Sequence, residues 1–213
     1  MRTRTKICTV LFLLVLFPNL ISAQLRPLYK PVTVEDLWLN YAYYPERADE
    51  IISMNDGEHY LILTNEYTID KYAYESPEKA SSIVTKQMLI PANDTKALKI
   101  ESFELNQTET ALLIKTDGEA IYRHSEISFY YVLDLTTNKL TALSDTKKQR
   151  LAEFSPNGAM IAYIIDNNLY VKDLKTGTST QITNDGLINN IINGTTDWVY
   201  EEEFSITKAF FWS

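Results

Sequence analysis

Short apolar runs alternate with polar turns along most of this chain, from Asp49 to the last residue. The runs are rich in Tyr, Ile, Val, Leu and Thr, which favour strands, and the segments between them carry Gly, Asn and Asp. This pattern predicts an all-β fold for residues 50–213, in which neighbouring antiparallel strands are joined by short turns.

The same pattern recurs at a fixed interval. An apolar residue is followed three positions later by Asn at 52–55, 103–106 and 154–157, so that successive copies lie 51 residues apart. Each copy precedes an apolar strand: YLIL, ALLI or MIAYII. A second landmark, YVLDL at 131–135 and YVKDL at 170–174, is followed both times by a polar turn and another short strand. Recurrence at this length indicates a repeat architecture.

The third unit, residues 154–183, shows the repeat most clearly. It contains a strand, an Asn-Gly turn, a strand, an Asn-Asn turn at 167–168, a strand, a Gly turn and a final strand. Four antiparallel strands in a unit of about 40–50 residues are typical of a β-propeller blade. The alternative is a sandwich of unrelated hairpins, which the repeated spacing disfavours.

The number of units predicts an incomplete ring. A propeller closes with about 4–8 blades, whereas this sequence supplies about three four-stranded blades and the start of a fourth. The final AFFWS, residues 209–213, is similar to AEFSP at 152–156. We therefore expect a partial β-propeller, truncated inside a strand and left with an unpaired sheet edge.

The N-terminus carries a different apolar run. Basic residues come first, an apolar stretch follows at 7–17, and the small residues Ser22 and Ala23 end the segment. This layout predicts a signal peptide over residues 1–23 and a lead-in segment over 24–49. An uncleaved membrane anchor is the alternative, but the run is short for a span of about 20 residues. Export to the periplasm, the outer surface or the medium follows.

Composition narrows the classes of partner. The formal net charge of −8 argues against a nucleic-acid partner, because phosphates require a basic surface. The chain has one cysteine, Cys8, inside the predicted signal peptide, and two histidines, so that we expect no disulfide, metal site or cofactor.

Two places depart from the repeat by carrying extra residues. The interval from Phe103 to Tyr131 is 28 residues, whereas the interval from Phe154 to Tyr170 is 16, so that the second unit carries 12 extra residues around TDGEAIYRHSEIS. The junction after the third unit carries 19 extra, within NDGLINNIINGTTDWVYEEEF. Insertions on a rigid scaffold commonly carry function.

The second insertion contains three consecutive glutamates, Glu201, Glu202 and Glu203. Neighbouring carboxylates repel one another unless a cation binds them. Two carboxylates fit a compact ammonium better than calcium, because calcium takes six to eight oxygen ligands. A solvated acidic turn or a helix start is the alternative, which the spacing alone favours. On a strand, Glu201 and Glu203 would share a face; on a helix, Glu202 and Glu203 converge only near an end or a bend.

The residues of both insertions resemble a known family. TTDWVYEEEF resembles the glutamate motif of the dipeptidyl peptidase IV family, in the prolyl oligopeptidase clan, and YRHS at 122–125 resembles a shorter element of that family. The resemblance implies a serine exopeptidase that releases Xaa-Pro or Xaa-Ala dipeptides. It also implies an eight-bladed propeller over a C-terminal α/β-hydrolase domain, and it allows a homodimer.

The resemblance also assigns roles to particular residues. Glu202 and Glu203 would bind the α-ammonium of a peptide with a free N-terminus, and Arg123 would hold a substrate carbonyl. Glu201, Asp197, Trp198 and Tyr200 would shape the segment without binding substrate directly.

The reacting half of such an enzyme is missing from this sequence. No G-x-S-x-G nucleophile motif occurs, so that we assign no catalytic residue, and His59 is expected to be a surface or blade-turn histidine. We therefore expect the chain to recognise substrate without catalysing hydrolysis by itself. A non-enzymatic periplasmic propeller that serves as a binding or scaffold module is the alternative, and a family member without a nucleophile is another.

Overall fold

The fold is described from a computed structural model of the chain, which describes residues 31–44 and 51–213. These two segments belong to separate units. The predicted signal peptide, residues 1–23, and the two ends of the predicted lead-in segment, residues 24–30 and 45–49, lie outside the described residues.

The first segment contains one short helix, α2 (Val34–Trp38). Its start is fixed by a reciprocal cap. The hydroxyl of Thr33 accepts a hydrogen bond from the Asp36 backbone N–H at 3.1 Å, and the Asp36 carboxylate accepts one from the Thr33 N–H at 3.4 Å. Among the described residues, no helix is long and apolar enough to cross a membrane.

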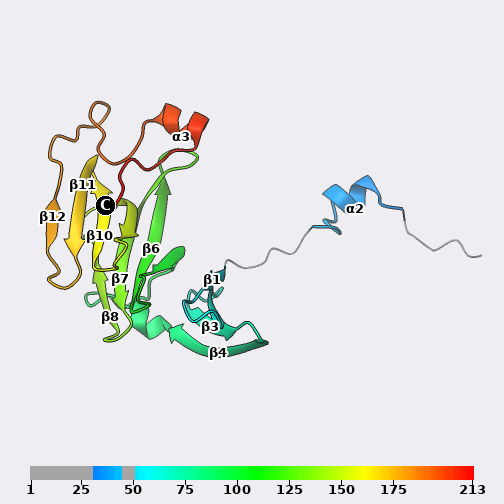
Figure 1. Ribbon diagram of the computed structural model, residues 1–213. Helices are drawn as coiled ribbons and strands as arrows, with labels where there is room; N and C mark the ends of the chain where they lie inside the picture. Colours follow the sequence, from blue (N-terminus) through cyan, green and yellow to red (C-terminus); the bar gives the residue numbers. More distant parts are fainter. Residues whose placement is uncertain (1–30, 45–50) are drawn as a thin grey trace, which may run out of the picture. The chain divides into compact units, whose positions relative to one another are not determined.

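Residues 51–213 form three four-stranded antiparallel sheets, as the repeat predicts (Figure 1). Each sheet pairs its strands in chain order, and a short 3₁₀ helix, η1 (Lys86–Leu89), follows the first. We call the sheets blades 1, 2 and 3. Blade 1 comprises β1 (Ile51–Ser53), β2 (His59–Leu63), β3 (Ile69–Ala73) and β4 (Ser76–Val84); blade 2 comprises β5 (Ser102–Leu105), β6 (Ala111–Ala120), β7 (Glu126–Asp134) and β8 (Lys139–Ala142); blade 3 comprises β9 (Arg150–Phe154), β10 (Met160–Ile165), β11 (Asn168–Asp173) and β12 (Ser179–Gln181).

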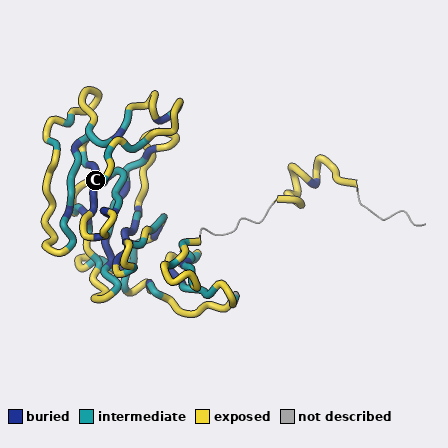
Figure 2. The backbone as a smooth tube through the Cα atoms, viewed as in Figure 1, coloured by how far each residue is buried: buried dark blue, intermediate teal, exposed yellow. Residues whose placement is uncertain are grey.

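The hydrophobic core lies between successive blades, because the middle strands are buried on both faces. Consecutive side chains of a strand point to opposite faces. In β6, Leu112 and Ile114 therefore join one core with residues of blade 1, while Ala111 and Leu113 join another with residues of blade 3. Figure 2 shows buried residues along these middle strands. This double burial explains why the predicted strands are continuous apolar runs.

The structural repeat differs slightly from the sequence repeat. Gly57, Glu109 and Gly158 occupy equivalent turns, with φ of 70°, 54° and 68°. Each donates its backbone N–H to the residue three positions earlier. Their spacings are therefore 52 and 49 residues rather than 51, and Asn55, Asn106 and Asn157 are not equivalent. The spacing between equivalent turns is not constant, because the turns tolerate small differences in length whereas the strands beside them keep their pairing.

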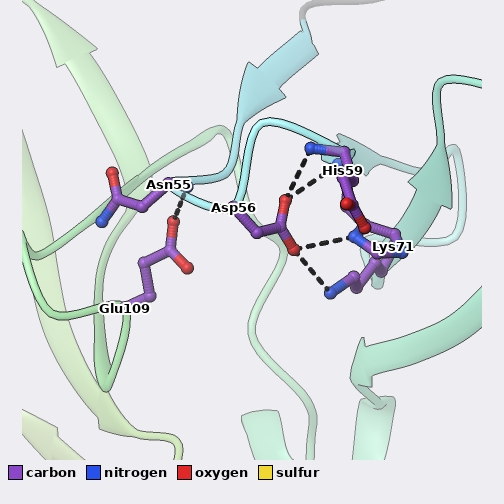
Figure 3. Close-up of polar contacts among 6 residues, drawn as sticks. Asn55, Asp56, His59, Lys71 and Glu109 are labelled. Carbon is purple, nitrogen blue, oxygen red and sulfur yellow. Dashed lines mark hydrogen bonds and ion pairs between the residues drawn. The ribbon is translucent and has the colours of Figure 1, made fainter.

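These turns also connect one blade to the next. The backbone N–H of Asn55, in blade 1, donates to the Glu109 carboxylate of blade 2 at 2.5 Å (Figure 3). The side-chain amide of Asn55 donates to the Gln107 carbonyl at 2.8 Å. Gly158 of blade 3 lies against Asn106 of blade 2, so close that a Cβ there would stand 3.1 Å from the Asn106 amide nitrogen. Two Asn residues of the repeat, Asn55 and Asn106, thus mark contacts between blades.

Asp56 closes the turn between β1 and β2. Its carboxylate accepts hydrogen bonds from the Glu58 and His59 backbone N–H groups, meets the His59 ring at 2.7 Å and lies 3.5 Å from the Lys71 ammonium (Figure 3). The Glu58 N–H is the main cause that lowers the pKa of Asp56 to about 2, and the bonds from His59 add to it. His59 is therefore a turn residue of blade 1, as expected.

Two local details differ from the sequence predictions. The turn between β10 and β11 uses Asp166 and Asn167, with φ of 48° and 59°, rather than Asn167 and Asn168. Positive φ at both positions is the requirement of the tightest hairpin turn. Residues 209–213, expected to begin another strand, form no strand in the described structure; Lys208 makes one isolated bridge with Thr195. A strand needs a neighbouring strand to pair with, and none adjoins this segment among the described residues.

Candidate functional site

The first insertion lengthens the hairpin of blade 2. Strand β6 has 10 residues, whereas its counterpart β10 has 6, and the register of the β6–β7 pair shifts between Thr116 and Glu119. The extra length carries the hairpin tip, residues 121–125. Ser125 closes this tip, because its carbonyl accepts hydrogen bonds from the N–H groups of Ile121 and Tyr122.

The second insertion contains a helix, α3 (Trp198–Phe204), on which all three glutamates lie. Asp197 caps its start: the side chain accepts hydrogen bonds from the N–H groups of Val199 and Tyr200 at 2.9 and 3.1 Å. Ser205 ends it in the left-handed conformation, with φ of 55°. Of the two geometries considered from the sequence, the helix is therefore the one that forms.

Helical geometry separates the three glutamates by burial. Neighbouring side chains diverge by about 100° around a helix, and accordingly Glu201 is 1% exposed, Glu202 is largely buried and Glu203 is exposed. Glu202 and Glu203 both lie in the last turn before Ser205. They thus lie near a helix end, which is the condition under which adjacent glutamates can serve one small cation.

The two insertions meet at this helix. Arg123, at the hairpin tip, lies 3.4 Å from a carboxylate oxygen of Glu202. The Arg123 side chain is 76% exposed and that of Glu202 only 13%. The structure therefore brings together two of the three predicted binding residues. The third, Glu203, is the next residue of α3 and makes no ion pair with any described residue.

Glu201 makes the contacts that hold this junction. One oxygen accepts a hydrogen bond from the His124 backbone N–H at 3.2 Å, and the other lies 3.9 Å from the guanidinium of Arg150, at the start of β9. Burial lowers the pKa of Arg150 from its ordinary value, and the negative charge of Glu201 opposes that shift. Sequence reasoning missed Arg150, because nothing distinguishes it from other residues that begin a strand.

The position of the glutamates is unfavourable for the helix itself. The C-terminal end of a helix carries partial negative charge, so that carboxylates in the last turn are repelled, and α3 has no basic residue there. A local conflict of this kind, without compensation inside the helix, is typical of a functional site. A cation bound by Glu202 and Glu203 would relieve it.

A cavity in the described part of the chain lies beside this site. It has a volume of about 1000 Å³ and is lined by residues that include Tyr122, Arg150 and Trp198, but by none of the three predicted binding residues. Within the described segments, no group of three or more metal-ligating side chains is arranged around a common centre.

Comparison with known proteins assigns this architecture to a family. The family model for the dipeptidyl peptidase IV (DPP IV) N-terminal region matches residues 106–213, which include both insertions. The chain therefore belongs to this family, as the motifs indicate.

Individual relatives agree with that assignment. The chain is 32% identical to dipeptidyl aminopeptidase B of Saccharomyces cerevisiae over 78% of its own length and 20% of the yeast protein. It is 29% identical to human prolyl endopeptidase FAP over 74% of its length and 20% of that protein. The chain thus spans about a fifth of the length of these relatives.

A solved structure supports the fold in the same way. The crystal structure of Porphyromonas gingivalis dipeptidyl peptidase 4 matches 84% of this chain and 26% of that chain, with a TM-score of 0.71 and 36% identity. The predicted all-β, incomplete propeller is therefore confirmed by the three blades and by this match.

Proposed function

We propose that this chain is the substrate-recognition region of an exported serine exopeptidase that releases Xaa-Pro or Xaa-Ala dipeptides from peptide N-termini. Glu202 and Glu203 bind the α-ammonium of the substrate, and Arg123 donates to a substrate carbonyl. The α/β-hydrolase domain that cleaves the bond is a separate C-terminal part of the complete protein, which can form a homodimer.

The observation that carries this proposal is the arrangement at the end of α3. Two carboxylates occupy the last turn, Glu203 is exposed without an ion-pair partner among the described residues, and Arg123 lies 3.4 Å from Glu202. An ammonium offers three hydrogen-bond donors in a compact group, and two carboxylates bind it with charge-assisted bonds. Arg123 supplies donors beside them for an acceptor one peptide unit further along.

Such a site would select the bond that is cleaved. An α-amine has a pKa of about 7.7–8.0 and is mostly charged at neutral pH, and two carboxylates favour that charged form further. Holding it at a fixed distance from a nucleophile allows one peptide bond to reach that nucleophile. Binding energy spent at the N-terminus thereby orients the scissile bond.

The test compares free and blocked N-termini on the complete protein. We expect cleavage of an Ala-Pro substrate with a free amine and no measurable cleavage of the N-acetylated form. Replacing Glu203→Gln should lower kcat/KM by about 10- to 100-fold, the effect of losing one charge-assisted hydrogen bond. Glu109→Gln, in a turn of blade 2 outside the site, is the matched control and should leave turnover unchanged.

Two results would contradict the proposal. Equal turnover of the acetylated substrate, or normal turnover by Glu203→Gln, would refute the role of the glutamates. A complete protein that binds free-amine peptides but hydrolyses none would instead support a non-enzymatic binding propeller.

A further inference from the structure

We infer that Glu201 is a positioning residue that fixes the distance between the carbonyl-binding Arg123 and the ammonium-binding glutamates. This inference rests on the proposed function for the roles of Arg123, Glu202 and Glu203. The contacts of Glu201 itself come from the structure alone. It is the most buried of the three glutamates, at 1% exposure.

Glu201 connects three elements that are remote in sequence. From α3, its carboxylate reaches the tip of the β6–β7 hairpin, 77 residues away, and the first residue of β9 in blade 3. The hydrogen bond from the His124 N–H fixes the backbone immediately after Arg123. Because Glu202 immediately follows Glu201 on the helix, one side chain sets the position of both partners in the Arg123–Glu202 pair.

The contact with Arg150 joins Glu201 to the paired strands of blade 3. Arg150 is 14% exposed and starts a strand that is paired with β10 in blade 3. Glu201 is its one carboxylate partner among the described residues, and the Arg150 Nε has no hydrogen-bond partner there. A buried charge without its counter-ion is strongly unfavourable, so that Arg150 and Glu201 keep each other in place.

Without Glu201, the hairpin tip has few other anchors to α3. Among the described residues, the other ion pair or hydrogen bond between the tip and α3 is the Arg123–Glu202 pair, in which the Arg123 side chain is largely exposed. An exposed ion pair is weak, because it orders long side chains in a solvent of high dielectric. A substrate that requires both Arg123 and the glutamates would then have to order the tip as it binds, and its affinity would fall.

The first experiment measures amide hydrogen exchange of the hairpin tip in the complete protein, without substrate. Glu201→Leu should accelerate exchange at His124 about 10- to 100-fold, since a hydrogen bond to a charged acceptor is lost. Glu201→Gln keeps an acceptor for that N–H and should show a smaller increase. Glu203→Gln, exposed on the same helix, is the control and should leave exchange at the tip unchanged.

The second experiment separates positioning from stability with the double variant Glu201→Leu/Arg150→Leu. Replacing both members of a buried ion pair by apolar residues commonly restores stability, so that its urea midpoint should return close to that of the wild type. Exchange at the tip should remain fast, and KM for an Ala-Pro substrate with a free amine should rise about tenfold or more while kcat changes less.

Each outcome decides between the alternatives. Unchanged amide exchange at His124 in Glu201→Leu would overturn the positioning role of Glu201. A double variant that regains slow exchange at His124 together with stability would overturn it as well. Fast exchange combined with normal KM would overturn its coupling to substrate binding. Failure of the proposed function shows separately, as normal turnover by Glu203→Gln, and does not alter the exchange result.

Discussion

The cores between the blades and the junction of the two insertions are held together by different forces. Between blades 1 and 2, buried residues such as Leu61, Leu112 and Ile114 pack without charge. At the junction of the insertions, the buried contact is instead an ion pair between the carboxylate of Glu201 and the largely buried guanidinium of Arg150. Apolar packing is non-directional, whereas charged contacts depend on distance and orientation.

This difference suits the two regions to different tasks. The blade cores can tolerate the small offsets seen between equivalent turns, since apolar side chains repack. At the insertions, Arg123 lies 3.4 Å from Glu202, and directional contacts fix the segments that carry them. The scaffold therefore provides stability, and the junction provides geometry.

The largest effect is expected in the core between blades 1 and 2. Ile114→Ala should destabilise the fold by about 3–4 kcal/mol, because Ile114 is fully buried and the removed atoms leave a cavity. Ile182→Ala is the matched control: Ile182 is 54% exposed, and its loss should change the free energy of unfolding by less than about 0.5 kcal/mol. Urea unfolding measures both, and equal effects would contradict the contrast between these positions.

A smaller loss of stability is expected when Lys172, a buried cation within the blades, is replaced. Its ammonium donates to the carbonyls of Ala142 at 2.8 Å and Leu143 at 3.4 Å. Lys172→Met should cost about 1–2 kcal/mol at neutral pH, because those bonds between blades 3 and 2 are lost. Lys175→Met, at an exposed position three residues further on, is the control and should have little effect.

The same residue gives a pH dependence with a definite sign. Burial lowers the pKa of Lys172 below its ordinary value. Between the folded and the unfolded pKa, the unfolded state binds more protons, so that this residue adds stability as the pH rises toward about 10.4 and loses it as the pH falls. The difference in unfolding free energy between wild type and Lys172→Met should therefore grow from pH 7 to pH 10. A constant difference would show that Lys172 is solvated in the folded protein.

The smallest expected change in stability is a gain rather than a loss. Glu203→Gln should stabilise the substrate-free protein by about 0.3–0.5 kcal/mol, because it removes a carboxylate from the negative end of α3. Glu202→Gln is the comparison and should bring no such gain, since it also removes the partner of Arg123. Thermal unfolding at low salt measures the difference, which should shrink at 1 M NaCl. A loss of stability in Glu203→Gln would indicate a structural role for this side chain.

The fold could be predicted from the sequence because its determinants are local. Alternating apolar runs and turn residues specify strands and hairpins, and the repeat specifies that they form blades. The register of the repeat could not be predicted in the same way. In the third unit, Ser155 occupies the turn position that Asn106 occupies in the second, although the sequence pattern aligns Asn157 with Asn106.

The candidate site was only partly predictable. The motifs identify Arg123, Glu202 and Glu203, but the distances between them depend on how two insertions fold back on one scaffold. The contacts of Glu201 with His124 and Arg150 involve a backbone group and an ordinary strand residue. Neither carries a pattern that a single sequence can reveal.

The turn at Asn106 has a consequence for covalent modification. Asn106-Gln-Thr matches the acceptor triplet for N-linked glycans, as does Asn93-Asp-Thr. The Asn106 side chain is 6% exposed, its oxygen accepts the Thr110 and Ala111 N–H groups, and its nitrogen donates to two threonine hydroxyls. A sugar attached to that nitrogen would collide with blade 3 and open the turn. In a host that glycosylates such triplets, the folded protein would accept a glycan at the exposed Asn93 and resist one at Asn106.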